Sequence, residues 1–225
     1  MTSVANPFQA RLEAALQALD MGADIAHAPQ LLRYLQELQR WNKAYNLTAV
    51  RDPERMLIQH LFDSLAVLPP LRSLRGTQDT RIADMGSGAG LPGIIVAICQ
   101  PEWQVVCIDA VHKKVAFIRQ VAGVLGLDNV TALHGRIQDI PPQNADIVIS
   151  RAFASLLDFA ALSAPHLAPG GTMLAMKGHF PQDEAAVLQA QSVWAVKDSI
   201  ELQVPELDAQ RCLVYLGLKE IHDSR

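Results

Sequence analysis

The sequence lacks the features of a membrane or secreted protein. No apolar stretch among its 225 residues approaches the roughly 20 residues needed to cross a bilayer. The first residues, MTSVANPFQARLEAALQALD, contain no basic segment followed by an apolar one, so they do not predict a signal peptide. We therefore expect a cytoplasmic protein that has no membrane partner.

Cysteine is scarce and shows no pattern. The three cysteines, Cys99, Cys107 and Cys212, lie far apart, and none forms a CxxC pair. Such spacing offers neither a disulfide framework nor a zinc site, which fits a reducing compartment. The histidines show no ligand spacing either, so no metal is predicted. We interpret the cysteines as buried, reduced, small apolar side chains.

A net positive charge is also missing. The chain has 19 Lys and Arg against 23 Asp and Glu, which gives a formal net charge of −4. Phosphate binding usually comes with a basic surface, so this charge argues mildly against a nucleic-acid partner. Any RNA contact must then depend on local clusters of Lys and Arg.

What the chain does have is apolar content and helical periodicity. Half of it is hydrophobic, enough for one α/β domain with a helical appendage. Apolar residues recur at helical spacing over 8–19 and 31–38. Asp52-Pro53 has the form of an N-cap with proline at the first helical position. The helix that follows is expected to end at Pro69-Pro70, before a polar connection. Residues 1–75 are predicted to form an N-terminal helical region.

From Arg81 onward, short apolar runs alternate with helical stretches. This alternation predicts βαβ crossovers and a parallel sheet. Helices are expected over 92–99, 111–125 and 156–167, with Gly126 as the C-cap of the second. The last two apolar runs are joined by the short PELDAQ turn and predict an antiparallel finish. The predicted strands are 81–85, 104–109, 130–133, 146–150, 172–176, 199–204 and 212–218.

The strongest motif is a glycine loop, DMGSGAGLPG, at residues 84–93, which follows a predicted strand and opens a helix. Glycines allow sharp turns and let a ligand approach the backbone closely, and a helix start offers free N–H groups. A dinucleotide-binding loop has the spacing G-x-G-x-x-G. Here the third glycine comes one residue early, and Leu91 stands where that pattern needs glycine.

The loop instead resembles the first motif of class I methyltransferases, D/E-x-G-x-G-x-G. This resemblance implies that S-adenosylmethionine lies over the loop. The motif residues are Asp84, Gly86, Gly88 and Gly90, and all four are predicted to bind the cofactor.

Asp109 is the second element of the predicted cofactor site. It ends the next predicted strand, about where an acidic residue in such folds binds ribose. A carboxylate there can accept hydrogen bonds from both ribose hydroxyls. The alternative is a simple cap for the helix that begins near Val111. Asp109 alone does not separate the two interpretations, and the glycine loop upstream favours ribose.

Several strings elsewhere in the chain match one family. Together with the glycine loop, they resemble the bacterial 16S ribosomal RNA guanine-N7 methyltransferases, the RsmG or GidB family. They extend from Trp41 to the C-terminal strands, so the resemblance covers nearly the whole chain. The matching strings are WNKAYNLT at 41–48, HLFDSL at 60–65, KVAF at 114–117, SRAFA at 150–154 and Lys177-Gly178.

The resemblance implies a class I, Rossmann-like methyltransferase domain over 76–225, with a seven-stranded, mostly parallel sheet. It implies methyl transfer from S-adenosylmethionine to N7 of one specific guanine of 16S ribosomal RNA in the small ribosomal subunit, by an enzyme expected to be a monomer. The family usually has Glu where this chain has Gln138, so the role of that side chain is open. By position, the implied cofactor contacts are Gly86, Leu91, Ile137, Gln138 and Arg151.

The implied reaction needs no strong general base, because neutral guanine carries a lone pair on N7. Positioning and desolvation should supply most of the acceleration. Arg151 stands where the target base should enter, and its guanidinium could bind the O6/N7 edge of guanine. It could not stay on N7 during transfer. We predict that Arg151 is the catalytic-site residue that positions the base or the cofactor, with a structural ion pair as the alternative.

Negative observations weaken two other base methylations. Adenine N6 methylation generally uses a D/N-P-P-Y/F motif after the fourth strand, where this chain has Ser150-Arg151-Ala152-Phe153. Cytosine C5 methylation needs a nucleophilic cysteine, often after proline, and no cysteine here follows a proline.

Six basic residues are candidates for an RNA-facing patch, because they lie near strand ends or on the helix after Asp109. Each is alternatively a solvated surface charge. Lys177 is the best candidate, since it closes a predicted strand and precedes glycine. The six are Lys113, Lys114, Arg119, Arg136, Lys177 and Arg211.

A polar group precedes the sheet region. His60, Asp63 and Ser64 share one helical face, because they are three and four residues apart. They predict either a polar shelf beside the cofactor or base, or helix packing and loop capping. Trp41, Asn42 and Asn46 leave the same choice open.

Three other functions compete with the methyltransferase interpretation. A dinucleotide-dependent oxidoreductase is disfavoured by the displaced third glycine. A non-catalytic RNA-binding module is disfavoured by the intact Asp84, glycine loop and Asp109. A methyltransferase for a small molecule or a protein is excluded only by the family strings, because the glycine loop would be the same.

Overall fold

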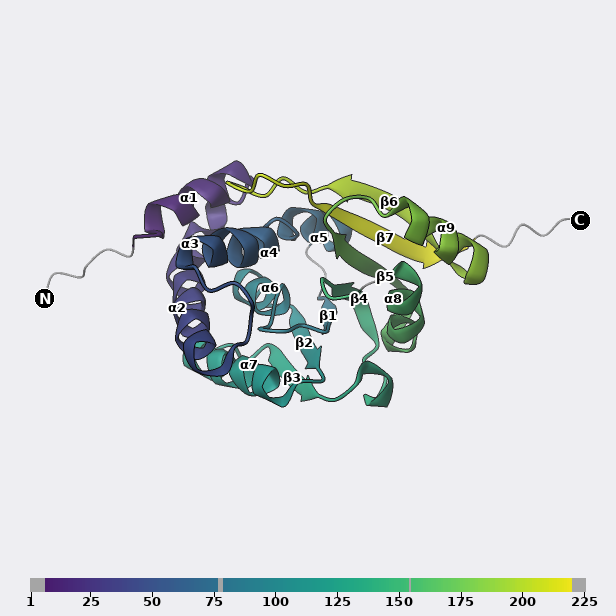
Figure 1. Ribbon diagram of the computed structural model, residues 1–225, viewed down its shortest axis with the longest axis horizontal. Coiled ribbons are helices and arrows are strands. Elements are labelled where there is room, and N and C mark those ends of the chain that lie inside the picture. The colour runs from purple at the N-terminus through teal and green to yellow at the C-terminus, as the bar shows by residue number, and fades with distance from the viewer. Residues whose placement is uncertain (1–6, 77–78, 154, 220–225) are drawn as a thin grey trace, which may run out of the picture.

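The sheet of this protein has the strand order β3-β2-β1-β4-β5-β7-β6, with helices on both of its faces (Figure 1). The structure is a computed structural model that describes residues 7–76, 79–153 and 155–219. Strands β1 to β5 pair in parallel, and β7 runs antiparallel between β5 and β6. The predicted mostly parallel sheet with an antiparallel finish is therefore confirmed. The strands are β1 Arg81–Met85, β2 Gln104–Asp109, β3 Val130–His134, β4 Ala145–Ser150, β5 Leu167–Lys177, β6 Trp194–Glu201 and β7 Cys212–Leu218.

The order of strands determines where a ligand can bind. Strand β1 lies between β2 and β4. The chain adds β2 and β3 on one side of β1 and then crosses back to add β4 and β5 on the other side, so the strand order reverses at β1. Ligands of open α/β sheets bind in the crevice at the carboxyl ends of the strands, where the strand order reverses. The glycine loop follows β1, and Arg151 follows β4. Two segments far apart in sequence thus meet at this crevice.

Two predicted strands are wrong in their bounds. The strand predicted over 172–176 begins earlier, because β5 starts at Leu167. We predicted a strand over 199–204, but β6 starts at Trp194 and ends at Glu201. It lies at the edge of the sheet, where only some of its side chains are buried, and the polar Lys197 and Asp198 interrupt its apolar run. Its position is set by pairing with β7, from Trp194 opposite Leu218 to Glu201 opposite Cys212.

The helices after β1 follow the predictions with two changes. Gly126 has a φ of 66° and caps α7 as predicted, and the Leu127 N–H donates to the Ala122 carbonyl at 2.9 Å. The third predicted helix is shorter than expected and continues as a turn of 3-10 helix. Helix α9 was not predicted, because Leu188 is its one buried residue. These elements are α6 Gly93–Cys99, α7 His112–Leu125, η3 Ile137–Asp139, α8 Leu156–Ser163, η4 Ala164–His166 and α9 Gln182–Gln191.

The N-terminal region is helical throughout most of its length. Asp52 caps α3 as predicted, because its Oδ2 accepts the Arg55 N–H at 2.9 Å. The prediction that Pro69-Pro70 ends a helix is wrong, since both prolines lie in the first turn of α5. A missing N–H costs little there, because the first N–H groups of a helix have no partner within it. The elements are α1 Gln9–Ala18, η1 Gly22–His27, α2 Ala28–Tyr45, α3 Pro53–Met56, η2 Leu57–Phe62, α4 Asp63–Leu65 and α5 Leu68–Arg75.

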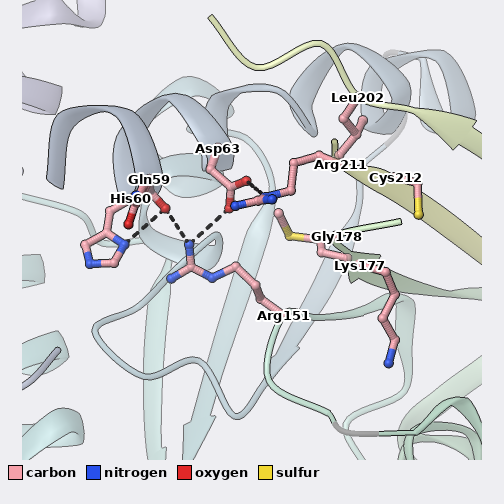
Figure 2. A pocket seen from close by; sticks show the side chains of 10 residues that line it. Gln59, His60, Asp63, Arg151, Lys177, Gly178, Leu202, Arg211 and Cys212 are labelled. Carbon is pink, nitrogen blue, oxygen red and sulfur yellow. Dashed lines mark hydrogen bonds and ion pairs between the residues drawn. The ribbon is translucent and has the colours of Figure 1, made fainter. Parts of the chain in front are cut away.

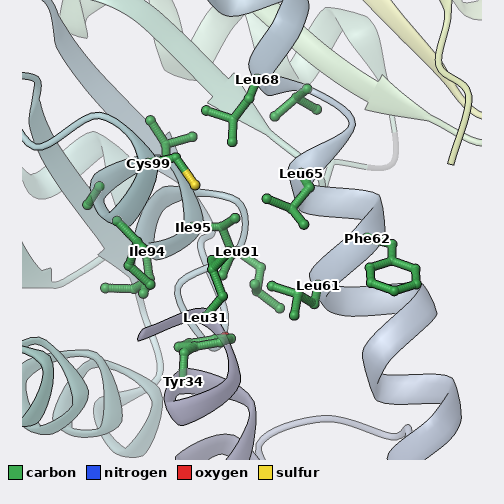
Figure 3. Packing of buried hydrophobic residues seen from close by; sticks show 14 of the residues in the cluster. Leu31, Tyr34, Leu61, Phe62, Leu65, Leu68, Leu91, Ile94, Ile95 and Cys99 are labelled. Atoms are coloured by element: carbon green, nitrogen blue, oxygen red, sulfur yellow. The ribbon is translucent and has the colours of Figure 1, made fainter. Parts of the chain in front are cut away.

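These helices pack on the glycine loop and α6 (Figure 3). Leu31 of α2 and Leu61 of η2 belong to the same buried cluster as Leu91 of the loop and Ile94 of α6. Full burial of one such side chain stabilises the fold by about 1.5–3 kcal/mol. This shared cluster fixes the N-terminal helices directly against the glycine loop. The division into regions 1–75 and 76–225 stays a prediction.

The cysteines are free and buried, as predicted. Burial raises the pKa of Cys99 to about 12 and also raises the pKa of Cys107, so both thiols stay protonated at neutral pH. Among the helices of the described ranges, none has the length and apolar character that a membrane span requires.

A buried amide closes the connection from α6 to β2. The Asn129 Nδ2 donates to the carbonyls of Ala97, Gln100 and Trp103 at 3.1, 3.2 and 3.0 Å. Replacing Asn129 by Ala removes this donor from all three carbonyls, of which Gln100 still accepts the Trp103 N–H at 3.1 Å, and an unsatisfied buried polar group costs about 1–3 kcal/mol. We expect Asn129→Ala to lower the free energy of unfolding by about that amount in urea titrations. The exposed Asp128→Ala is the control, and equal stability of the two variants would contradict this role.

Candidate functional site

The glycine loop turns through left-handed backbone at each of its first three glycines. The φ angles are 67° at Gly86, 61° at Gly88 and 83° at Gly90, a region that favours glycine. A Cβ on Gly90 would lie 2.5 Å from Ile94 Cγ1, whereas a Cβ on Gly88 would meet nothing within 4 Å. The absence of a side chain at Gly90 therefore lets the loop pack closely against Ile94 of α6. Gly88 leaves open space above the backbone, where a ligand can approach.

Three hydrogen bonds from three different elements hold this loop. Asp84 Oδ2, in β1, accepts the Gly93 N–H at 2.9 Å, and Asp109 Oδ2, in β2, accepts the Gly88 N–H at 2.8 Å. The Tyr34 hydroxyl, in α2, donates to the Ala89 carbonyl at 2.8 Å. The loop is consequently fixed before any ligand arrives.

Asp84 supports the loop from inside the protein. Its side chain is fully buried, and its Oδ1 has no hydrogen-bond partner among the described residues. Burial raises the pKa of Asp84 to about 7, although the Gly93 N–H and the charge of Arg151 oppose the shift. Asp84 does not line the cavity over the loop, so it acts there through the backbone that it holds.

Asp109 joins the start of α7 to the glycine loop. Its Oδ1 accepts the Val111 N–H at 2.8 Å, directly before α7, in the manner of the capping alternative, and its Oδ2 accepts the N–H of Gly88, while ribose binding stays a prediction. Lys114 Nζ lies 3.9 Å from Oδ2. Two carboxylate oxygens offer about four acceptor sites, so Asp109 keeps capacity for ribose hydroxyls.

A cavity of about 200 Å³, the loop cavity, lies over the glycine loop. It brings together four of the predicted cofactor residues, Gly86, Gly88, Leu91 and Arg151. Thr48 and His60 form its opposite wall. Five other predicted residues do not line it: Asp84, Gly90, Asp109, Ile137 and Gln138.

The last two of these lie beyond β3. Ile137 and Gln138 belong to η3, and the Gln138 side chain is exposed. The Ile137 carbonyl is 3.1 Å from His166 Nε2, and the Gly135 N–H donates to the Asp109 carbonyl at 3.2 Å. The η3 turn is thus connected to Asp109 but separated from the loop cavity.

A second cavity, of about 390 Å³, adjoins the loop cavity (Figure 2). Arg151 and His60 line both cavities, so they form the wall between them. Lys177 and Arg211 line the second cavity, together with the apolar Met176 and Leu202. The arrangement provides one space for a cofactor and an adjacent space for a second substrate.

Asp63 binds two arginines across the second cavity. Arg151 Nη1 lies 3.1 Å from Asp63 Oδ2, and Arg211 Nε lies 2.8 Å from Asp63 Oδ1 (Figure 2). Arg151 Nη1 also donates to the Gln59 carbonyl at 3.1 Å. The ion pair that we considered as the alternative role of Arg151 is present. Its Nε and Nη2 have no hydrogen-bond partner in the described ranges, so they can still bind a substrate.

His60 is neutral at physiological pH. Burial, together with the charge of Arg151, lowers its pKa to about 4. Its Nδ1 lies 3.1 Å from the Gln59 carbonyl, which can only accept, and its Nε2 lies 2.9 Å from Thr48 Oγ1. We therefore assign the proton to Nδ1 and an accepting role to Nε2. His60 adds no positive charge to the wall that it shares with Arg151.

The other members of the predicted polar shelf have structural roles. Asn42 binds the Thr48 N–H and the Val50 carbonyl, at 2.8 and 3.0 Å, and so holds the segment that carries Thr48. Asn46 ends α2 in left-handed backbone, and Ser64 is fully buried. Trp41 packs against Phe117 with ring centroids 5.6 Å apart. Of the six, His60 and Asp63 are the residues that line the loop cavity or the second cavity.

The predicted basic patch is divided among several places. Lys177 lines the second cavity but is bound to Glu184 Oε2 at 2.8 Å and to the Phe153 carbonyl at 3.1 Å. Lys114 lines the loop cavity. Arg211 lines the second cavity and is bound to Asp63. The other three are exposed: Lys113 donates to the Tyr45 carbonyl, Arg119 donates to the Ala132 carbonyl, and Arg136 follows β3.

Sequence reasoning missed the contacts that join distant segments. Asp63 and Arg211 are 148 residues apart, and no local pattern could pair them. Tyr34 looked like one more residue of an apolar helix face. Thr48 had a weak signal, since it ends the WNKAYNLT string. Ala154, which ends the SRAFA string, lies outside the described residues.

Comparison with known proteins yields one family. The family described as GidB, rRNA small subunit methyltransferase G, matches residues 27–214. The ribosomal RNA small subunit methyltransferase G of Bordetella avium is 55% identical over 207 residues, which cover 92% of each chain. The protein of the same name from Methylibium petroleiphilum is 49% identical over 95% of this chain and 98% of its own length.

Solved structures share the fold at low sequence identity. A SAM-dependent methyltransferase from Aquifex aeolicus superposes with a TM-score of 0.55 and 18% identity, over 75% of this chain and 94% of its own. The ribosomal protein L11 methylase of Lactobacillus delbrueckii subsp. bulgaricus gives a TM-score of 0.54 and 13% identity, over 71% and 78%. The predicted Rossmann-like methyltransferase fold is thereby confirmed.

The raised pKa of Asp84 predicts a pH-dependent stability. Its folded pKa of about 7 exceeds the ordinary value of 3.8, so its stabilising protonated form is lost as the pH rises between these values. We expect Asp84→Asn, which stays neutral, to gain stability relative to the wild type over this range, by at most about 1.4 kcal/mol per pH unit. Urea titrations at several pH values measure the difference. A pH-independent difference between Asp84→Asn and the wild type would contradict the assignment.

Proposed function

Because the chain belongs to the GidB family of rRNA small subunit methyltransferases G, we propose that it transfers a methyl group from S-adenosylmethionine to 16S ribosomal RNA. The proposed acceptor is N7 of one specific guanine in the small ribosomal subunit. The same proposal includes a cytoplasmic, monomeric enzyme with a helical region over 1–75 and a methyltransferase domain over 76–225. The alternative of a dinucleotide-dependent oxidoreductase does not fit this family.

The observation that carries the proposal is the contact between two cavities at Arg151. The loop cavity contains the open space above Gly88, and the second cavity lies on the other side of the Arg151 side chain. Methyl transfer needs a donor and an acceptor held next to each other in line. Two adjoining cavities with a shared wall meet that need.

The residues present fit S-adenosylmethionine, which supplies an electrophilic methyl group on a positively charged sulfur. Gly88 has room for a ligand directly over its backbone. In the proposal, Gly86, Gly88 and Leu91 hold the methionine part, and Asp109 accepts hydrogen bonds from the ribose. Ile137 and Gln138, in the turn after β3, would bind the remaining part of the cofactor.

The side chains at the shared wall suit an acceptor that needs no deprotonation. The N7 lone pair of neutral guanine is already available, so the site requires no general base. His60 is neutral and fully hydrogen-bonded, which suits a wall rather than a proton acceptor. Asp63 offsets part of the charge of Arg151 and Arg211, so a cationic donor meets less repulsion.

Arg151 is the residue proposed to position the substrates. Its unused Nε and Nη2 donors can bind the O6 edge of guanine, the commonest specific pairing with that base, or the cofactor. Its bonds to Asp63 and Gln59 hold the guanidinium in place. A fixed guanidinium loses less entropy on binding than a free one, so these contacts prepare it for its role.

The open space over Gly88 makes cofactor binding testable by a small substitution. We expect Gly88→Ala to weaken S-adenosylmethionine binding at least about 10-fold in calorimetry, because its Cβ fills the proposed cradle. Gly126→Ala is the matched control, since Gly126 also has a positive φ and open space around it but lies at the end of α7. Equal affinities of the two variants would remove the loop from the cofactor site. Failure of the wild-type protein to bind the cofactor would overturn the function itself.

The methyl acceptor is tested with radiolabelled cofactor and small subunits that lack their own modification, followed by mapping of the labelled base. We expect Arg151→Ala to lower kcat/KM about 10- to 150-fold, the equivalent of one hydrogen bond to a charged group. Arg151→Lys should restore little, because lysine lacks the planar fork of donors. Normal transfer and normal cofactor affinity in Arg151→Ala would refute its positioning role.

A further inference from the structure

The last turn of α2 presents an aromatic ring on the surface, close to the loop cavity. This ring belongs to Tyr45, a residue that is 51% exposed. Its ring centroid lies 5.0 Å from that of Trp41, and Trp41 in turn packs on the fully buried Phe117. The exposed ring therefore rests on a rigid aromatic base, and it needs little further ordering to bind a flat partner.

Three cations without acidic partners lie near the C-terminal end of α2, which carries this ring. Lys43 and Arg51 line a third cavity, of about 260 Å³, which also exposes amide groups such as that of Asn46. Arg51 Nη2 donates to Asn46 Oδ1 at 3.0 Å, and Lys113 Nζ donates to the Tyr45 carbonyl at 2.7 Å. Within the described ranges, none of the three cations has a carboxylate oxygen within 4.0 Å.

The acidic residues that follow in sequence are occupied by other bonds. Asp52 Oδ2 accepts the Arg55 N–H at 2.9 Å, as the cap of α3. Glu54 is bound to Arg11 of α1. The backbone N–H does not neutralise the Asp52 carboxylate, so in a chain with a net charge of −4 this stretch carries three unpaired cations against one unpaired carboxylate.

This area is a short distance from the cofactor. Leu47 and Thr48 line the loop cavity, so the chain passes from the exposed ring to that cavity within three residues. Three residues span at most about 10 Å. Tyr45 therefore lies within about 10 Å of a residue that lines the loop cavity, a distance that about three stacked nucleotides of one strand span at about 3.4 Å each.

We propose that Lys43, Tyr45, Arg51 and Lys113, the Tyr45 surface, bind a single-stranded RNA segment next to the methylated nucleotide. One unpaired base stacks on the Tyr45 ring, and the cations contact phosphates. Aromatic stacking combined with unpaired cations is the usual way in which proteins bind unpaired RNA. A protein partner is disfavoured, because the groups around the ring are cations and amides rather than an apolar patch. The inference rests on the proposed function for its biological substrate.

Stacking is tested by changing the ring alone. We expect Tyr45→Ala to raise KM for small subunits about 5-fold or more, since one stacked base contributes at least that factor. The kcat value and the cofactor affinity should stay within about 2-fold of the wild type, because Tyr45 lines neither cavity of the site. Tyr45→Phe should retain the wild-type KM. Val193→Ala, an exposed apolar residue between α9 and β6 at the far end of the sheet (Figure 1), is the control.

Phosphate contacts are tested through the salt dependence of RNA binding, which needs no catalysis. Each phosphate contact to single-stranded RNA contributes about 0.7 to the slope of log K against log salt concentration. We expect the double variant Lys43→Ala with Arg51→Ala to reduce this slope by about 1.4. The matched control is Lys197→Ala with Lys219→Ala, two lysines that also lack a carboxylate partner in the described part of the chain and lie near β6 and β7.

The outcomes separate this inference from the proposed function. A wild-type protein that binds no cofactor or methylates no RNA refutes the function, while the binding measurements still decide the inference. Unchanged KM in Tyr45→Ala, equal damage in Tyr45→Phe, or an unchanged salt slope in the double variant overturns the inference. So does an effect seen with whole small subunits but absent with 16S RNA stripped of protein, which would assign the surface to a ribosomal protein.

Discussion

The shape of the glycine loop is the constraint on which the site depends. Left-handed backbone costs a residue with a side chain roughly 1–2 kcal/mol, so three such positions in five residues are feasible only with glycine. The shape is maintained by partners outside the loop. The hydrogen bonds at Gly88, Ala89 and Gly93 come from β2, α2 and β1, and they fix the loop relative to the sheet and to the N-terminal helices at the same time.

The N-terminal helices contribute to the chemistry as well as to packing. They supply Tyr34 to the loop, His60 to the wall between the cavities and Asp63 to the two arginines. The loop cavity is lined on one side by the glycine loop and Arg151 and also by Leu47, Thr48 and His60 from before the first strand. The second cavity likewise combines residues from η2 and α4 with residues that follow β4, end β5 and flank β7. Both cavities therefore depend on this combination of helices and sheet.

The sequence predicted what local patterns encode. The strand bounds of β1, the C-cap Gly126 and the N-cap Asp52 followed from apolar runs, glycine and capping chemistry. The predictions failed where tertiary contacts decide, as in β6, which takes its register from β7, and in α5, which begins where prolines suggested an end. One motif and one family string predicted the four residues that line the loop cavity together, Gly86, Gly88, Leu91 and Arg151. The pairing of Asp63 with Arg211 was not predictable, because nothing near either residue points to the other.

Asp63 links two parts of the molecule that could otherwise vary independently. One carboxylate holds the guanidinium after β4 and the guanidinium before β7, so a shift of either changes the electrostatic environment of the other. Substitutions at residues in one such network do not add. Exchanging the C-terminal hairpin for that of a relative would therefore alter the geometry on the opposite side of the second cavity, unless the helical residue changed with it. The hairpin and the helix are in this sense coupled through one carboxylate.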